Sequence, residues 1–265
     1  MYNEYFKKEQ YCSKPKSMIT ENEQQRYSRH LLLDGFGIEG QEKLAQSKVL
    51  IVGAGGLGSP VAYYLAAAGV GTIGLIDGDV VDISNLQRQI IHDTQHIGMP
   101  KVDSAAEKII ALNPHVHVNT YHELFTAENG EALVQAYDFI IECTDNYAAK
   151  FLVNDICVAA QKPFSHGSVL RLEGQAMTYV PGSACYRCLY PQPPLDGVVP
   201  TAAQAGVMGP VAGLLGTIQA TEALKYLTGI GTLLTNRLCV VNALGMNFMN
   251  LKIARRSDCE TCSAH

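Results

Sequence analysis

The chain has 265 residues, a formal net charge of −5 and 47% hydrophobic residues. This composition excludes a disordered, collagen-like or coiled-coil protein, and the length fits one α/β domain with additions. The lysines and arginines are scattered along the sequence, which argues against the basic surface of a nucleic-acid-binding protein.

The N-terminal segment, residues 1–18, is polar and without hydrophobic periodicity, and it predicts a mobile tail. It has no apolar stretch long enough for a secretory signal, so we expect a cytoplasmic protein. Residues 19–265 predict a single domain. No charged residue lies between Gly197 and Thr221, but the glutamines, threonines and prolines in that run favour a buried helix over a membrane span.

The first half of the domain predicts alternating helices and strands. A helix should begin at Glu21, because Thr20 and Glu23 have the spacing of a capping box, and run to Leu33 before the sequence GFGIEG ends it. A short helix is expected at 41–47. Further strands are predicted at Val49–Val52, Thr72–Ile76, Val116–Tyr121 and Phe139–Glu142, and helices at Pro60–Ala68, Lys101–Leu112, Glu128–Gln135 and Asn146–Ala160. Such alternation is typical of a Rossmann-like, doubly wound, mostly parallel sheet.

After Ala160 the pattern changes. Four segments predict strands that pair in an antiparallel extension of the sheet: Ser165–Leu170, Gln175–Val180, Arg237–Val241 and Met246–Ile253. A proline-rich loop at Tyr190–Pro200 and a long helix at Pro210–Leu227 lie between them. We therefore expect an α/β fold with one half at about 46–163 and the extension at about 164–265.

A glycine-rich motif predicts a nucleotide site. Gly53, Gly55 and Gly58 form G-x-G-x-x-G between a predicted strand and a predicted helix, where backbone amides and a helix N-terminus can bind phosphate. Asp77 lies 19 residues beyond Gly58, at the end of the next strand, where a carboxylate can bind a ribose. The motif alone fits both ATP and a nicotinamide cofactor.

Charged residues after this motif favour ATP. Arg88 and Lys101 follow the ribose carboxylate, and two cations suit a triphosphate better than a dinucleotide. Asp145 follows the strand Phe139–Glu142, where its carboxylate could hold Mg²⁺. The alternative is that Asp145 or Thr144 caps the next helix.

Half of the eight cysteines form two C-x-x-C pairs, Cys185 with Cys188 and Cys259 with Cys262. Four thiolates suit one tetrahedral structural zinc ion, and a redox pair is the alternative. The apolar surroundings of Cys143, Cys157 and Cys239 predict buried thiols, and the tail holds Cys12.

Seven motifs in this order resemble those of the MoeB/ThiF/HesA superfamily of adenylating enzymes, relatives of ubiquitin-activating enzymes. They are RYSRHLLL (26–33), GAGGLGSP (53–60), AGVGTIGLIDGDVVDISNLQRQ (68–89), residues 98–101, CTDN (143–146), CYRC (185–188) and CETC (259–262). The resemblance implies ATP-dependent adenylation of the C-terminal Gly-Gly carboxylate of a small ubiquitin-like sulfur-carrier protein, with release of pyrophosphate. The carrier would belong to molybdopterin or thiamine synthesis and bind the half at 164–265, and a cysteine desulfurase or a rhodanese would supply the sulfur.

The resemblance also implies roles for individual residues. Arg29 would reach into the site of a second subunit, which predicts a homodimer, and Asp145 would hold Mg²⁺. The implied catalytic residues are Arg29, Arg88, Lys101 and Asp145. The implied nucleotide-binding residues are Gly53, Gly55, Gly56, Gly58, Asp77, Asp79, Ser84, Asn85, Leu86, Gln87, Arg88, Lys101, Asp145 and Asn146.

One position departs from the pattern of that superfamily. Many members carry a cysteine, able to bond covalently to the carrier, in the loop before A-G-V, and Ala202 occupies that position in PTAAQAGV (200–207). We therefore expect adenylation without an acyl-enzyme.

Two alternatives to a sulfur-carrier adenylyltransferase are an enzyme that adenylates another peptide or protein C-terminus and, more remotely, an NAD-dependent dehydrogenase.

Overall fold

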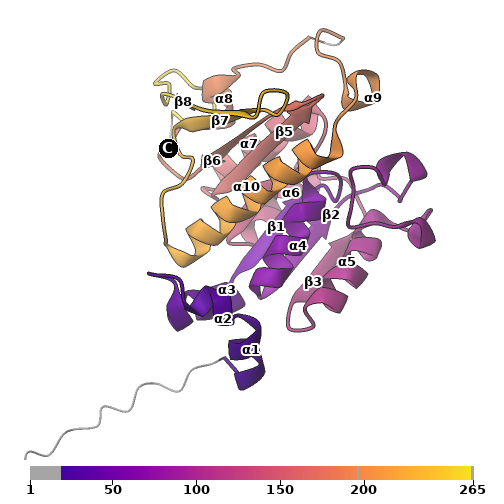
Figure 1. Ribbon diagram of the computed structural model, residues 1–265. Helices are drawn as coiled ribbons and strands as arrows, with labels where there is room; N and C mark the ends of the chain where they lie inside the picture. Colours follow the sequence, from indigo (N-terminus) through magenta and orange to yellow (C-terminus); the bar gives the residue numbers. More distant parts are fainter. Residues whose placement is uncertain (1–18, 196, 264–265) are drawn as a thin grey trace, which may run out of the picture.

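The computed structural model describes residues 19–195 and 197–263, so the predicted tail at 1–18 lies outside the described residues. One sheet of eight strands, in the order β3-β2-β1-β4-β5-β6-β7-β8, runs through the molecule with helices on both faces (Figure 1). Neighbours from β3 to β5 are parallel and those from β5 to β8 are antiparallel, as predicted. The strands are β1 (Lys48–Val52), β2 (Thr72–Ile76), β3 (His117–Tyr121), β4 (Phe139–Glu142), β5 (Phe164–Leu170), β6 (Glu173–Tyr179), β7 (Arg237–Asn242) and β8 (Asn247–Lys252).

Continuous apolar strands divide the core into two layers. Side chains alternate along β1, so Val49 and Ile51 belong to one hydrophobic cluster while Leu50 and Val52 belong to the other. Because both faces are covered, β1, β2 and β4 are apolar except at their ends, as expected for a parallel sheet.

The helices divide between the two faces of the sheet. Helices α3, α4, α5 and α10 contribute to the first cluster, and α6, α7 and α8 to the second. The helices are α1 (Glu21–Arg26), α2 (Ser28–Leu31), α3 (Gly37–Gln46), α4 (Gly58–Ala68), α5 (Lys101–Leu112), α6 (Ala127–Gln135), α7 (Tyr147–Ala159), α8 (Tyr186–Leu189), α9 (Ala202–Ala205) and α10 (Gly209–Thr228). Among these described helices, none is both long and apolar enough to cross a bilayer.

The prediction of one continuous helix from Glu21 to Leu33 is wrong, because the segment forms two short helices. Helix α1 ends at Arg26 and α2 begins at Ser28, because the intervening Tyr27 turns inward, where its buried hydroxyl accepts a hydrogen bond of 2.8 Å from Asn113 Nδ2. The predicted break at GFGIEG is also too long, since Gly37 already begins α3. Short helices α8 and α9 were not predicted from the sequence, because four residues are too few to show a period.

Candidate nucleotide site and metal centre

A cavity of about 550 Å³ lies beside the carboxyl ends of β1, β2 and β4. The strand order reverses between β1 and β4, which is where open α/β sheets bind ligands. Nine of the residues predicted for the nucleotide site line this cavity: Gly53, Gly55, Gly56, Asp77, Asp79, Arg88, Lys101, Asp145 and Asn146. Ala202, the first residue of α9, lines it as well. The other predicted residues, Gly58, Ser84, Asn85, Leu86, Gln87 and Arg29, are not among its lining residues.

The glycine loop is fixed by backbone contacts. Gly53 has φ +100°, and a Cβ at this position would lie 2.8 Å from the carbonyl oxygen of Cys143. A Cβ at Gly58 would lie 2.1 Å from the carbonyl oxygen of Gly53. Gly58 therefore serves the turn itself, whereas Gly55 and Gly56 leave backbone exposed to the cavity.

Asp77 and His92 both contact the backbone of Ala54 in the glycine loop. The Asp77 carboxylate accepts hydrogen bonds from the backbone N–H groups of Ala54 (2.8 Å) and Asp79 (2.9 Å). The buried His92 ring lies 2.9 Å from the Ala54 carbonyl oxygen through Nε2 and 3.0 Å from Ser104 Oγ through Nδ1. Burial lowers the pKa of His92, so the ring is neutral at pH 7.

The predicted cations Arg88 and Lys101 line the cavity, and each already has a protein partner. Lys101 Nζ lies 2.7 Å from Asp79 Oδ2, and the Arg88 guanidinium donates to Asn85 Oδ1 at 3.2 Å. Asn85 and Ser84 therefore orient Arg88, since the Ser84 carbonyl accepts from the same guanidinium at 3.2 Å. Gln89, which the sequence did not single out, also lines the cavity, and its buried Oε1 has no hydrogen-bond partner among the described residues. An amide oxygen only accepts, so this unpaired atom fits a donor such as a ligand hydroxyl or a bound water.

Asp145 has a different position from the other cavity carboxylates. It is exposed, and its carboxylate accepts no hydrogen bond from any described residue, whereas Asp77 and Asp79 are both bonded. The cap of α7 is Asn146, whose Oδ1 accepts from Ala149 N–H at 2.9 Å, so the alternative role of Asp145 as a helix cap is wrong. A carboxylate with unused oxygens in a cavity with two further acidic residues fits a hard cation such as Mg²⁺.

Glu142, Lys150 and His166 form a buried cluster near Asp145 that the sequence did not predict. Glu142, the last residue of β4, is 0% exposed, and it contacts Lys150 (3.1 Å) and His166 Nδ1 (2.7 Å). Burial raises the pKa of Glu142, but the charge of Lys150 and the hydrogen bond from His166 outweigh burial and hold it at about 2. The available signal was a glutamate that ends the otherwise apolar strand FIIE.

The cavity also has an apolar wall that was not predicted. Leu124 and Phe125, which follow β3, lie on the lining together with Gly78. An apolar wall beside a phosphate-binding loop suits a planar base.

The segment from Val199 to Ala202 forms another wall, and a short bridge anchors it. Arg171, in the turn after β5, donates its N–H to the Gly206 carbonyl (2.8 Å), and its own carbonyl accepts from Met208 N–H (3.0 Å). Ala202, at the start of α9, thus lines the cavity at the position where many members of the resembled superfamily carry a cysteine.

The four paired cysteines form one cluster, as predicted. Their Sγ atoms all lie within 4.8 Å of one another, with separations of 4.0 Å (Cys185–Cys188), 3.6 Å (Cys185–Cys259) and 3.4 Å (Cys188–Cys262). Thiolates bound to zinc at ~2.3 Å stand ~3.8 Å apart in a tetrahedron, so the cluster fits a closed zinc site. This arrangement argues against a separate redox pair.

Cys143, Cys157 and Cys239 are buried, as predicted, and Cys12 lies outside the described residues. Cys143 also lines the cavity, which the sequence did not indicate. Burial raises its pKa well above the usual range, so it is a protonated thiol and a poor nucleophile.

Comparison with known proteins identifies the family of this chain. Residues 27–262 match the ThiF family. The chain is 42% identical over 252 residues to adenylyltransferase and sulfurtransferase MOCS3 of Drosophila persimilis, covering 94% of this chain and 56% of that protein. It is 44% identical over 246 residues to the probable adenylyltransferase/sulfurtransferase MoeZ of Mycobacterium tuberculosis, covering 91% and 63%. The chain thus spans little more than half the length of these relatives.

Solved structures with the same fold include E. coli MccB with ATP, at a TM-score of 0.80 and 23% identity, covering 90% of this chain and 74% of that one. PaaA has a TM-score of 0.75 and 27% identity, covering 92% and 77%. These similarities support the α/β architecture described above.

Proposed function

The chain belongs to the ThiF family, and we propose that it is an adenylyltransferase that transfers AMP from ATP to the C-terminal carboxylate of a small ubiquitin-like sulfur-carrier protein. The observation that carries this proposal is the cavity at the strand switch point. It combines a glycine loop, two cations and the unpaired carboxylate of Asp145. The names of the two relatives supply the reaction class.

The chemistry follows from charge. A carboxylate oxygen must attack the α-phosphorus of ATP while pyrophosphate leaves, and both partners are anions. Arg88 and Lys101 would offset this repulsion from fixed positions, and Asp77 would bind the ribose. Lys101 must exchange Asp79 for a phosphate oxygen when the nucleotide binds. Mg²⁺, held by Asp145, would supply further neutralisation of the triphosphate.

A protein partner is supported by the surface of the antiparallel extension. β8 is the edge strand of the sheet, and its side chains Phe248, Met249 and Leu251 are about half exposed. An apolar edge strand is a liability unless a partner covers it. We propose that the carrier docks here and that its sulfur comes from a cysteine desulfurase or a rhodanese.

We also propose a homodimer in which Arg29 completes the site of the partner subunit. Arg29 is exposed on α2, away from α9 at the other end of the molecule (Figure 1). Leu32 and Leu33 beside it are 74% and 52% exposed, which supports an interface at this surface.

The direct test is ATP–pyrophosphate exchange in the presence of purified carriers of the molybdopterin type and the thiamine type. Replacing Arg88 or Lys101 by Ala, or Asp145 by Asn, should each reduce exchange at least ~10²-fold, the effect of losing one preorganised charged group. The control is Lys43→Ala, which removes a surface ion pair with Glu39 outside the cavity.

The outcomes separate the alternatives. Exchange within about threefold of the wild type for all three variants would place the phosphates elsewhere. Exchange with a peptide but with neither carrier would indicate a different acceptor. Reduction of NAD without exchange would indicate a dehydrogenase.

A further inference from the structure

The carboxylate of Glu142 is the centre of a buried network beneath the cavity. One oxygen accepts from the Thr144 N–H (2.7 Å) and the Thr144 hydroxyl (2.5 Å), and the other accepts from His166 Nδ1 (2.7 Å). Lys150 Nζ lies 3.1 Å from both oxygens. Glu142, Lys150 and His166 are 0%, 4% and 1% exposed.

The same lysine also holds two backbone carbonyls. Lys150 Nζ donates to the Thr144 carbonyl (2.7 Å) and to the Gly167 carbonyl (2.8 Å). An ammonium has three protons, so these two bonds and the carboxylate use all of them. Although Lys150 borders the cavity, it has no proton left for a ligand.

The contacts converge on the backbone of one residue, Thr144. Thr144 gives its N–H to Glu142 and its carbonyl to Lys150, so the backbone just before Asp145 is fixed at both polar groups. The Asp145 side chain has no hydrogen-bond partner of its own among the described residues. Its position therefore depends on the backbone that carries it.

We propose that Glu142, Lys150 and His166 are positioning residues that hold Asp145 where the metal–triphosphate complex requires it, without touching the nucleotide themselves. This inference rests on the nucleotide site proposed above and adds residues to it. Loss of a group that orients a metal ligand typically lowers metal affinity about 10- to 100-fold. The Glu142–Lys150 pair forms hydrogen bonds with two backbone carbonyls and one backbone N–H. Apolar side chains in the same positions would leave these three backbone groups without partners.

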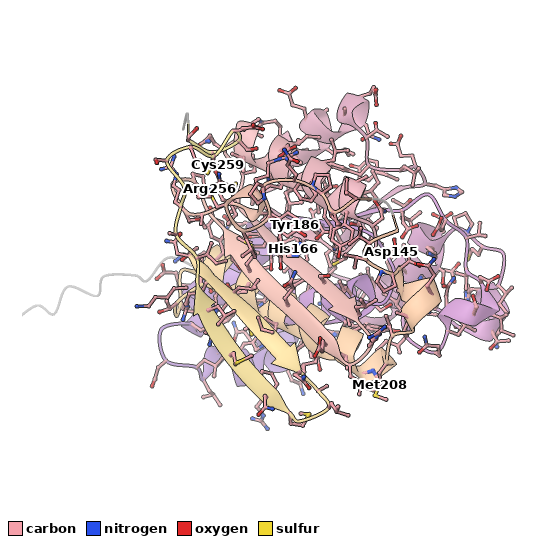
Figure 2. All side chains as sticks on the ribbon, turned by 90° about the horizontal axis from the view of Figure 1, so that it is seen from above. Asp145, His166, Tyr186, Met208, Arg256 and Cys259 are labelled. Atoms are coloured by element: carbon pink, nitrogen blue, oxygen red, sulfur yellow. The ribbon has the colours of Figure 1, made fainter. Side chains whose placement is uncertain are left out.

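His166 contributes a neutral donor. A carboxylate only accepts, so the proton lies on Nδ1, and Nε2 has no partner among the described residues. The ring packs 4.4 Å from the ring of Tyr186, and Figure 2 shows the two side by side between Cys259 of the zinc cluster and Asp145. Because Tyr186 follows Cys185 directly, this ring contact connects the segment of the cysteine cluster with the network beside Asp145.

The chain contains a matched control for a buried glutamate. Glu222 is 2% exposed, accepts from the Thr178 hydroxyl (2.7 Å) and the Leu234 N–H (2.6 Å), and pairs with Lys225. Like Glu142 it has a lysine, a threonine hydroxyl and a backbone N–H as partners, but it has no histidine partner, and neither it nor these partners line the cavity. Loss of its charge should affect folding without affecting Asp145.

The experiment measures binding rather than turnover. Calorimetry with α,β-methylene-ATP, in EDTA and over a Mg²⁺ titration, gives the metal-free affinity and the half-saturating Mg²⁺ concentration. We expect Glu142→Gln and His166→Phe to raise that concentration ~10-fold or more and to change the metal-free affinity less than about twofold. Lys150→Arg, which keeps the charge and the donors, should retain the wild-type value within about threefold, and Lys150→Met should not.

Each outcome decides the proposal. A Mg²⁺ requirement of folded His166→Phe and Glu142→Gln that matches the wild type overturns it, as does an equal shift in Glu222→Gln or wild-type binding that is independent of Mg²⁺. If Glu142→Gln does not fold, His166→Phe alone decides. Failure of pyrophosphate exchange with every carrier, together with the expected Mg²⁺ shifts, would refute the proposed reaction and leave the positioning role standing.

Discussion

Two glycines of the same loop have different functions at the scale of single atoms. A methyl group at Gly58 would lie 2.1 Å from the Gly53 carbonyl oxygen, whereas at Gly56 its nearest neighbours would be Ala212 Cβ and Arg88 Cγ, both at 3.4 Å. The first distance is impossible without a backbone shift, and the second is ordinary contact. Gly58 is therefore required by the turn, whereas Gly56 lines the cavity.

We predict that Gly58→Ala destabilises the fold by ~2 kcal/mol or more, in the range of an overpacked core. Gly56→Ala should change stability by less than ~0.5 kcal/mol and weaken ATP binding, because its methyl group would face the cavity. Urea denaturation and calorimetry measure the two effects. Equal loss of stability in both variants would contradict this division.

The burial of His166 leads to a prediction about how the stability of the fold depends on pH. Burial lowers its pKa in the folded protein despite the neighbouring Glu142, whereas in the unfolded chain it titrates near 6.5. Below pH 6.5 the unfolded chain therefore binds a proton that the folded protein does not, and stability falls as the pH falls. The loss attributable to this histidine is at most ~1.4 kcal/mol per pH unit.

The check compares thermal denaturation of the wild type and His166→Gln between pH 7.5 and 5.5. The wild type should lose more stability over this interval, since glutamine takes up no proton in either state. A parallel decline in both proteins would show that His166 does not contribute to the pH dependence.

At the scale of elements, the segment from Val199 to Met208 forms part of the cavity wall, and hydrogen bonds hold its C-terminal end in place. The Arg171 bridge fixes Gly206 and Met208, while α9 carries Ala202 into the cavity wall. Cys143 also lines the cavity, but burial raises the pKa of its thiol, which therefore stays protonated.

We predict that carrier and Mg-ATP yield carrier-adenylate and pyrophosphate but no thiol-sensitive adduct with the enzyme. Ala202→Cys should create such an adduct, because a thiol on the cavity wall would meet the carrier's C-terminus. Intact mass and non-reducing electrophoresis, with and without thiol, measure both. The control is Cys239→Ser, a buried cysteine away from the cavity, and an adduct in the unmodified chain would refute the prediction.

At the scale of the whole molecule, the cysteine cluster joins segments 74 residues apart in sequence. It connects α8 to the end of the described chain, and Arg187 of α8 makes a bidentate pair with Asp155 of α7 at 2.7 Å for both bonds. A metal that closes this connection contributes to folding directly.

We predict one zinc ion per chain by elemental analysis. Cys185→Ser or Cys262→Ser, or removal of the metal by a chelator, should lower the melting temperature by about 10 °C or more. Protein purified without chelators but free of zinc would disprove this. Cys157→Ser is the control, because that thiol is buried but outside the cluster.

The proposed homodimer leads to a separate prediction about exchange activity. Arg29→Ala and Lys101→Ala should each lose at least ~10²-fold in pyrophosphate exchange, since each removes a charge from the reaction. Mixing the two inactive proteins should restore part of the activity, because one site of the mixed dimer has both residues. If Arg29 acts within its own chain or not at all, mixing restores nothing.

The sequence by itself determined the features that depend on local spacing. Alternating apolar strands and helices fixed the parallel sheet, because side-chain period follows from backbone geometry. The glycine loop, Asp77 and the two C-x-x-C pairs were found because their function requires neighbours a few residues apart. Arg88 and Lys101 were placed at the site because they follow strand ends that a parallel sheet brings to one edge.

Only the tertiary structure decided which side chains are partnered. Asn146 rather than Asp145 caps α7, Asn85 holds Arg88, and Glu142 pairs with His166, 24 residues away. It also decided that Gln89 and Cys143 reach the cavity and that Tyr27 interrupts the first helix. Hydrogen bonding and burial are properties of positions in space, and residues from separate strands and helices acquire common surroundings only when the chain packs.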